Sequence, residues 1–275
     1  MGTLFVVVTP IGNLKDITFR ALETLKSVNI IACEDTRVTK KLLNYYGIGN
    51  KKLISYHEHN EDVVSERLVK ILEKEDIALI SDAGTPCISD PGYRLVKKAI
   101  ERGFKVSPIP GAFAGVAALS ASGLPSDKFL FVGFLSTKQS KKKQQISNYA
   151  SIGYTFVAYE SPHRLLDTLN LFAELLPDSQ LVIAKEITKI HEKFVYGTSI
   201  EVYNFFRENK ELIKGEFVIL CYPLYKRKEP SKEELKEVIQ NKKKEGLTNK
   251  QIVKLLIETY SLPRNKAYKL VHDVD

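Results

Sequence analysis

The stretch Ile77–Gly92, IALISDAGTPCISDPG, joins a short apolar run to a turn rich in Gly, Pro and Asp. We predict a strand over Ile77–Ser81, and further strands over the similar apolar runs Leu4–Thr9, Ile30–Cys33 and Val106–Ile109. Amphipathic stretches separate these runs, near residues 16–28, 36–46, 63–75 and 93–102. Continuous apolar strands that alternate with helices are typical of a parallel sheet covered by helices on both faces.

A second α/β domain with a mixed sheet is expected after Pro125, because strands there follow one another with fewer helices between them. Its predicted strands are Phe129–Leu135, Thr155–Tyr159, Leu181–Ile187, Phe194–Tyr196 and Phe217–Tyr222, and its predicted helices lie near residues 141–150, 164–175 and 200–209. We set the domain limits at 1–120 and 121–225.

The C-terminal residues, 231–275, have the pattern of a small helical module. Lys226–Pro230 is interpreted as a linker, and Ser231 as a helix N-cap followed at the third position by Glu234. Three helices are predicted near residues 232–245, 249–259 and 264–271. The module has the length of a helix-turn-helix, but most such modules do not recognise DNA, and packing or RNA docking explains it instead.

Composition narrows the class of protein. The 275 residues are 44% hydrophobic and 27% charged, a composition that excludes wholesale disorder, and the net charge is +8. Residues 226–275 contain 13 basic and 8 acidic residues, and a second basic cluster contains Lys138, Lys141, Lys142 and Lys143. Concentrated positive charge suits a phosphate backbone, although a solvated surface explains it as well.

Three separated cysteines and the lack of a membrane-length apolar run favour a cytoplasmic protein.

Several common motifs are absent. The sequence has no G-x-G-x-x-G, no P-loop and no G-x-S-x-G elbow. His57 and His59 flank Glu58, but in a strand the two imidazoles would point to opposite faces. We therefore predict no metal site.

Four polar turns follow the strands of the first domain. They are residues 9–13, 34–37, 81–92 and 108–112. Because ligands bind outside the carboxyl ends of strands in open α/β sheets, these turns predict a binding cleft. In the second domain, residues 159–164 and 188–192 place Glu beside His, Arg or Lys at strand ends. Such sets suit acid–base chemistry or substrate binding, but surface salt bridges produce them too.

The motifs TPIGNL, EDTR, SDAGTPxISDPG, PxPGAxA, SGLP with FVGFL, YESPHRL, TKIHE and GEFV occur in this order over residues 3–220. Together they resemble the bacterial 16S rRNA (cytidine 2′-O)-methyltransferases of the tetrapyrrole methylase superfamily. The resemblance implies a class III S-adenosylmethionine (SAM) methyltransferase fold, in which two α/β domains enclose the cofactor in the cleft between them, with a small C-terminal helical extension. It also implies a homodimer that methylates a cytidine ribose in the decoding centre of 16S rRNA, free or within the small ribosomal subunit.

The sequence departs from the family pattern at three places. Cys87 lies where the family usually has Gly, PGAFA replaces PGPSA, and GFLSTKQSKKK replaces a segment richer in Pro and Arg. The first two departures touch the expected cofactor pocket, whereas the third keeps its positive charge.

The resemblance also implies roles for individual residues. Cofactor contacts are expected at the residues Pro10, Ile11, Gly12, Asp82, Gly84, Thr85, Ile88, Phe113, Ala114, Tyr159 and Glu216. Glu160 and Glu192 are candidates to accept the proton of the ribose hydroxyl, with Lys189 stabilising the oxyanion. Asp82 is a further candidate, with buried turn capping as its alternative. RNA phosphates are expected to meet the residues Arg37, His59, Lys138, Lys141, Lys142, Lys143 and Arg164.

Two other classes of function stay open at this point. A precorrin-type tetrapyrrole C-methyltransferase would share the fold and cofactor, but it needs neither a lysine cluster nor a basic helical tail. A non-catalytic ribosome-assembly protein would not need intact strand-end turns, and it would not bind SAM.

Overall fold

The computed structural model describes residues 1–224, 232–260 and 262–273. The chain divides into two compact units, Met1–Leu224 and Tyr225–Asp275. The expected linker Lys226–Pro230 and the N-cap Ser231 lie outside the described residues, as does the side chain of Glu234. In the described part of the chain, no helix combines the length and the apolar character needed to cross a membrane.

The first sheet of the larger unit is parallel, with the strand order β3-β2-β4-β1-β5. Its strands are β1 (Thr3–Val7), β2 (Ile30–Cys33), β3 (Lys52–Ser55), β4 (Ile77–Ile80) and β5 (Lys105–Ile109). The four strands predicted for this region are confirmed within one or two residues at their ends. β3 was not predicted, since it is a short edge strand in which Lys52 and Ser55 are exposed.

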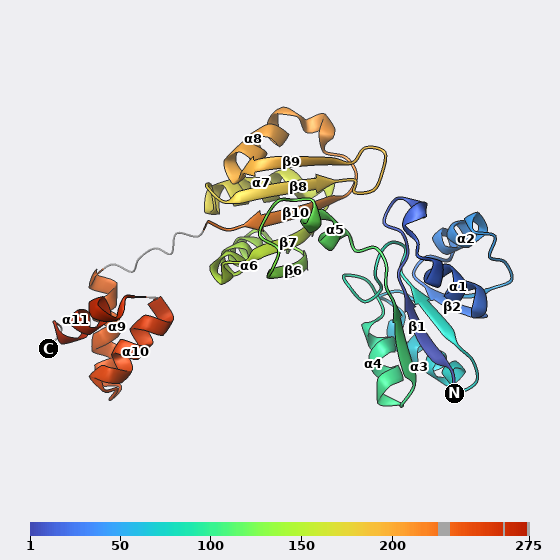
Figure 1. Ribbon diagram of the computed structural model, residues 1–275, viewed down its shortest axis with the longest axis horizontal. Coiled ribbons are helices and arrows are strands. Elements are labelled where there is room, and N and C mark those ends of the chain that lie inside the picture. Colours follow the sequence, from blue (N-terminus) through green and yellow to red (C-terminus); the bar gives the residue numbers. More distant parts are fainter. Residues whose placement is uncertain (225–231, 261, 274–275) are drawn as a thin grey trace. The chain divides into compact units, whose positions relative to one another are not determined.

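Helices cover both faces of this sheet (Figure 1). One face packs against α1 (Phe19–Ser27) and α2 (Thr36–Tyr45), and the other against α3 (Glu61–Leu72) and α4 (Tyr93–Glu101). Along β4, Ile77 and Leu79 enter one core while Ala78 and Ile80 enter the other. A strand buried on both faces must be apolar at every position, which is why the IALI run predicts it well.

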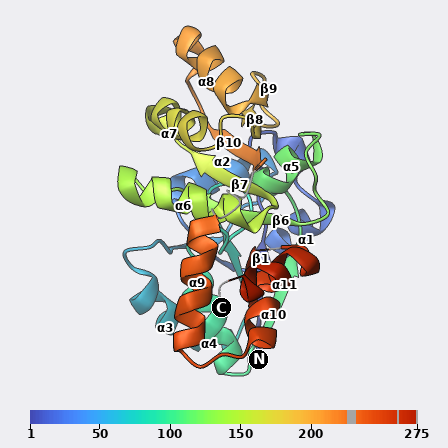
Figure 2. The ribbon, with the colours of Figure 1, turned by 90° about the vertical axis from the view of Figure 1, so that its left-hand side faces the viewer.

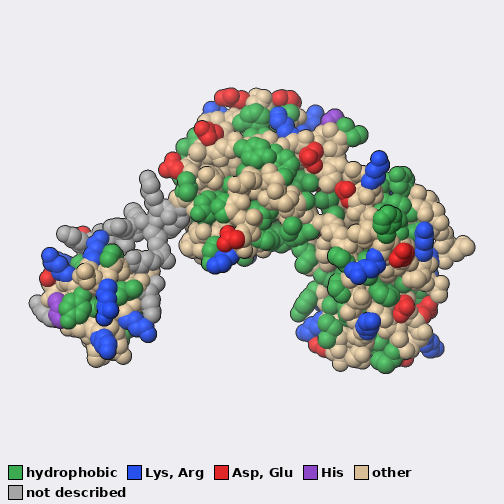
Figure 3. Space-filling model, in the orientation of Figure 1, with side chains coloured by type: hydrophobic (Ala, Val, Ile, Leu, Met, Phe, Trp, Pro, Cys, Tyr) green, Lys and Arg blue, Asp and Glu red, His purple; other side chains and the backbone are tan. Residues whose placement is uncertain are grey.

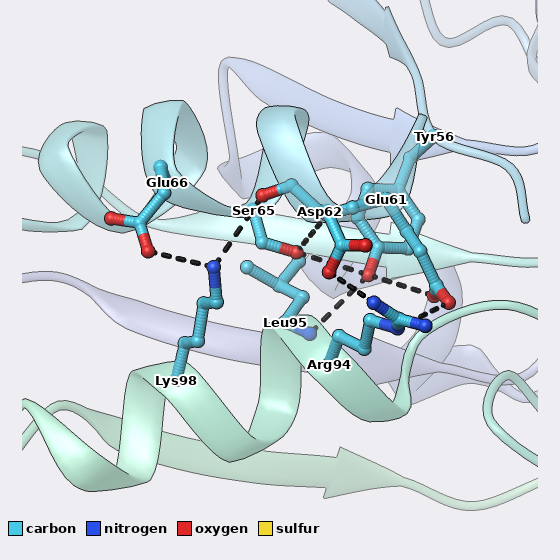
Figure 4. Close-up of polar contacts among 8 residues, drawn as sticks. All are labelled: Tyr56, Glu61, Asp62, Ser65, Glu66, Arg94, Leu95 and Lys98. Atoms are coloured by element: carbon cyan, nitrogen blue, oxygen red, sulfur yellow. Dashed lines mark hydrogen bonds and ion pairs between the residues drawn. The ribbon is translucent and has the colours of Figure 1, made fainter. Parts of the chain in front are cut away.

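A polar seam joins α3 to α4 (Figure 4). Tyr56 is buried, and its hydroxyl accepts a hydrogen bond from the backbone N–H of Leu95 at 3.3 Å and lies 3.2 Å from the Ser65 hydroxyl. Burial raises the pKa of Tyr56 to about 12, so the phenol stays protonated and able to donate. At the surface, Arg94 pairs with Glu61 and Lys98 pairs with Glu66.

The second sheet is mixed, as predicted, with the order β6-β7-β10-β8-β9. β6 and β7 are parallel, and the remaining pairs are antiparallel. The strands are β6 (Phe129–Phe134), β7 (Thr155–Glu160), β8 (Gln180–Lys185), β9 (Lys193–Thr198) and β10 (Phe217–Tyr222).

One face of the second sheet packs against the helices α6 (Gln139–Ile152), α7 (Pro162–Leu175) and α8 (Ser199–Glu208), and the other against α5 (Ala114–Ser120), as Figures 1 and 2 show. The domain limit expected at residue 120 stays a prediction, although α5 packs against β7 and β10.

The smaller unit contains three helices among its described residues, as predicted. They are α9 (Lys232–Lys244), α10 (Asn249–Tyr260) and α11 (Arg264–His272). Leu235, Ile239, Ile252, Leu256 and Val271 form its own core. Lys and Arg side chains lie at several places on the face of this unit that Figure 3 shows.

Candidate active site between the two sheets

A cavity of about 310 Å³ lies where the two sheets of the larger unit meet. The first sheet lines it with Ile11 after β1, residues 83–85 and 88–90 after β4, and Phe113 and Ala114 after β5. The second sheet contributes the ends of β6 and β7, Ile187 after β8, and residues 215–218 at the start of β10. The volume is within the range of small-molecule sites, and the lining is mostly apolar. The expected cleft at the carboxyl ends of the first sheet is thus present.

Backbone hydrogen bonds hold the loops of the first sheet in place. Thr9 and Gly84 exchange two of them, at 2.9 and 3.1 Å. The Thr85 hydroxyl donates to the carbonyl of Ala112 at 3.1 Å, which joins the loop after β4 to the loop after β5. Gly84 has φ +80°, and a Cβ there would lie 3.2 Å from Ile11, so the wall needs glycine at this position.

The loop after β1 also contacts the second sheet's lobe directly. The backbone N–H of Asn13 donates to the Thr188 hydroxyl at 3.1 Å. A Cβ on Gly12 would lie 2.5 Å from Cγ of Lys189 and 2.9 Å from the Thr188 hydroxyl. Because no side chain fits there, Gly12 allows the two lobes to meet at this point.

Aromatic rings form the opposite wall. Tyr159 packs edge-on against Phe131 and Phe134, with centroid distances of 5.1 and 5.6 Å, and Phe131 packs against Phe113 at 4.9 Å. Burial raises the pKa of Tyr159 to about 12, although a hydrogen bond from the backbone of Gly115 opposes this. The wall therefore presents neutral, apolar surface to a ligand.

Most of the residues expected to bind the cofactor lie together around this cavity. Its lining contains Ile11, Gly84, Thr85, Ile88, Phe113, Ala114, Tyr159 and Glu216. Pro10 is buried and does not line this cavity, and Gly12 lines a different cavity. Asp82 is exposed, so it is not a buried cap, and its carboxylate accepts from the backbone N–H of Asp35 at 3.0 Å.

The surroundings of Glu160 contradict its expected role as a proton acceptor. Its side chain has no exposed surface, and Oε1 accepts from the backbone N–H of Ser161 at 2.8 Å and from Arg164 at 2.7 Å. Oε2 accepts from the Thr168 hydroxyl at 2.7 Å and lies 3.5 Å from Nζ of Lys142. A carboxylate held by four donors fixes the start of α7 and is not available to take a proton.

The expectation that Lys142 meets RNA phosphates is wrong. Its side chain is 4% exposed and its Nζ donates to Thr168 at 2.7 Å, so the ammonium lies in the core of the second lobe. The neighbouring residues Lys138, Lys141 and Lys143 are exposed, and Lys143 pairs with Glu174. Arg164 is 25% exposed and is directed inward, to Glu160, Ser161 and the carbonyl of Leu135. The sequence shows a run of charge but does not show that one lysine of the run points inward.

The other candidate residues lie away from the cavity or at its edge. Lys189 joins Glu186 at 2.9 Å to Glu216 at 3.0 Å, and the Glu192 carboxylate accepts from the backbone N–H of Thr188 at 2.6 Å. Neither Lys189 nor Glu192 lines this cavity, and their catalytic roles stay predictions.

Arg37 and His59 are exposed at the edge of the first sheet, where Arg37 pairs with Asp35. His57 and His59 follow β3 in a turn, with ring centroids 6.0 Å apart, and so do not face opposite sides of a strand. Their roles toward RNA or other ligands stay predictions.

Asp90 is a cavity residue that the sequence reasoning missed. Burial, with the neighbouring carboxylates Glu34 and Asp82, raises the pKa of Asp90 to about 6, although a hydrogen bond with Ser81 opposes this. Cys87 and Ser89 of the same loop have positive φ angles of 71° and 64°, which is unusual for residues with a Cβ. The second SD pair of SDAGTPCISDPG was the available signal, since it repeats the acidic turn of the first.

The chain belongs to the tetrapyrrole (corrin/porphyrin) methylase family, whose model matches residues 3–203. Its sequence is 44% identical to ribosomal RNA small subunit methyltransferase I of Halalkalibacterium halodurans over 277 residues, covering 98% of this chain and 95% of that protein. The protein of the same name from Synechocystis is 45% identical over 98% of this chain and 97% of its own length.

Solved structures have the same fold. Diphthine synthase matches with a TM-score of 0.61 and 16% identity, over 81% of this chain and 90% of that chain. Uroporphyrin-III C-methyl transferase from Thermus thermophilus, complexed with S-adenyl homocysteine, matches with a TM-score of 0.54 and 18% identity, over 80% of this chain and 97% of that chain. At these identities the likeness shows the fold alone.

We predict that Lys142→Met destabilises the protein by about 3 kcal/mol, because Glu160 loses a buried cationic partner. Lys141→Met, one residue away on the exposed face of α6, is the control and is expected to change stability by less than about 0.5 kcal/mol. Urea unfolding of both variants measures the difference. Equal stabilities with weakened RNA binding of Lys142→Met would place this lysine at the surface.

Proposed function

We propose that this protein transfers a methyl group from SAM to the ribose 2′-oxygen of a cytidine in the decoding centre of small-subunit ribosomal RNA. The observation that carries the proposal is the cavity shared by the two sheets, in a chain whose relatives over nearly its full length are named ribosomal RNA small subunit methyltransferase I. The relatives support the substrate class, and the choice of a cytidine 2′-oxygen rests on the ordered motifs of the sequence.

The residues around the cavity fit SAM. Ile11, Ile88 and Phe113 offer apolar surface, and the glycine at position 84 brings backbone close to the cavity. The bound cofactor would supply an already activated methyl group on a positively charged sulfur. The chain then has to hold the ribose oxygen in line with that methyl group and exclude water, which needs rigid walls more than charged groups.

The wall is rigid because its polar atoms bond to one another. The exchange between Thr9 and Gly84, and the Thr85 bond to Ala112, fix the loops from the first sheet. The ion pairs around Glu160 fix the start of α7 opposite them. We propose that this preorganisation supplies most of the alignment.

Asp90 takes the place of Glu160 as the proposed proton acceptor. The carboxylates that line the cavity are Asp90, Glu160 and Glu216; Glu160 is held by four donors, and Glu216 pairs with Lys189. A carboxylate with a pKa near 6 is ionised at neutral pH and more basic than an ordinary Asp, which suits general-base catalysis on a hydroxyl.

RNA is proposed to approach over the basic surfaces of both units. Lys138 and Lys141 are exposed on the larger unit, and α9 ends in the run Lys242, Lys243 and Lys244. Neutralised phosphates release counterions, so we expect binding to weaken with salt. We further propose a homodimer that acts on the small ribosomal subunit in the cytoplasm.

Methyl transfer from labelled SAM tests this function. We expect purified small subunits that lack the modification to be labelled at one cytidine ribose, while a precorrin or uroporphyrinogen is not labelled. Ribose-methylation mapping of small-subunit RNA from a deletion strain is expected to lose the same mark. Labelling of the macrocycle alone would establish a tetrapyrrole methyltransferase, and no binding of SAM in calorimetry would favour a non-catalytic assembly role.

We predict that turnover falls by about 10²-fold or more in Asp90→Asn, while the dissociation constant for SAM stays within about twofold of wild type. In the wild type, kcat/KM should fall as pH drops through about 6, because Asp90 gains a proton there. Asp127→Asn removes an exposed carboxylate and serves as the control. A pH profile unchanged in Asp90→Asn, or an equal loss of SAM affinity, would contradict the assignment.

A further inference from the structure

A second cavity, of about 580 Å³, is lined by residues other than those of the first. It is lined by residues 12–15 after β1, by Tyr45 at the end of α2, and by residues 188–191 between β8 and β9. The two cavities are neighbours along the chain, because Ile11 and Ile187 line the first and the next residues, Gly12 and Thr188, line the second.

Two large apolar side chains of this second cavity face solvent. Tyr45 is 62% exposed and Ile190 is 97% exposed. The ring of Tyr45 rests edge-on against Tyr46, with centroids 5.0 Å apart, and the Tyr46 hydroxyl donates to the backbone carbonyl of Leu14. Tyr46 thereby fixes both the loop after β1 and the position of the Tyr45 ring, whose open surface can stack against a planar group.

Two lysines, Lys15 and Lys189, line the cavity together with Tyr45. In the described part of the chain, Lys15 has no ion-pair partner, in contrast to Lys189, which pairs with Glu186 and Glu216. Helix α2 contains Arg37, Lys40 and Lys41 but no acidic residue. Since Arg37, Lys41 and Tyr45 are spaced by four residues, they form a stripe along α2 that ends at the cavity.

An exposed aromatic ring beside free ammonium groups matches single-stranded nucleic acid, in which unstacked bases pack on aromatic side chains and phosphates meet Lys and Arg. We infer that the second cavity binds an unpaired nucleotide that flanks the methylated one, with its base on Tyr45 and its phosphate at Lys15. This inference rests on the proposed function for the identity of the polymer. The second cavity is built from three segments that are distant in sequence.

Fluorescence anisotropy with a labelled twelve-residue oligocytidylate and the full-length protein tests the site. Tyr45→Ala should weaken binding at least fivefold, whereas Tyr45→Phe, which keeps the ring, should stay within twofold of wild type. Lys15→Gln should also lower the slope of log affinity against log salt by about 0.7. Tyr154→Ala is the matched control, since Tyr154 is an exposed tyrosine on the other lobe, 43% exposed.

Calorimetry with SAM separates this inference from the proposed function, since all four variants should bind SAM as wild type does. Oligonucleotide binding that depends on Tyr45, without methylation of small subunits, would support the nucleotide site and refute the activity. Wild-type affinity of Tyr45→Ala, or no binding by the wild type, would overturn the site. Slower methylation of subunits by Tyr45→Ala at unchanged oligonucleotide affinity would also overturn it, because the contact would then be to protein.

Discussion

Both proposed binding sites of this protein depend on the close contact between the two lobes at Gly12. The loop after β1 and the turn between β8 and β9 meet there so closely that a Cβ would lie 2.5 Å from Lys189. On one side of the contact lies the apolar cavity shared by the two sheets, and on the other lies the open cavity with Tyr45. A methyl donor and an RNA strand could thus be held next to one another without sharing a surface.

The buried polar side chains of the second lobe bond to one another and to the backbone, and so they stabilise the fold instead of facing a ligand. Lys142, Arg164 and Thr168 surround the buried Glu160 carboxylate, and the Ser161 backbone completes its hydrogen bonds. A buried charge is tolerated only when it is paired and hydrogen-bonded, so this network fixes one arrangement of α6, β7 and α7. Asp90 differs because other carboxylates, not cations, are its charged neighbours.

Much of the fold can be predicted from the sequence, because its central strands are buried on both faces. IALI in β4 has no polar position, and the Gly- and Pro-rich turns after such strands mark the ligand edge. The edge strand β3 could not be predicted in this way, because Lys52 and Ser55 are exposed and only Ile54 is buried.

Side-chain roles were harder to predict than strands, because they depend on packing between distant segments. Lys142 and Glu160 are eighteen residues apart, and only the packing of α6 onto the second sheet brings the ammonium inward. Glu160 ends strand β7 and precedes His163 and Arg164, a sequence pattern that suits catalysis equally well. The second cavity joins parts of the TPIGNL and TKIHE motifs to Lys15 and Tyr45, and no sequence pattern shows that these segments meet in the folded chain.

Hydrogen–deuterium exchange with and without SAM tests most directly whether one site is built from both lobes. We expect slower amide exchange at residues 83–90 and 112–114 of the first lobe, together with residues 159–162 and 215–218 of the second, over the same range of SAM concentrations. Protection confined to one lobe, or no protection at saturating SAM, would contradict it.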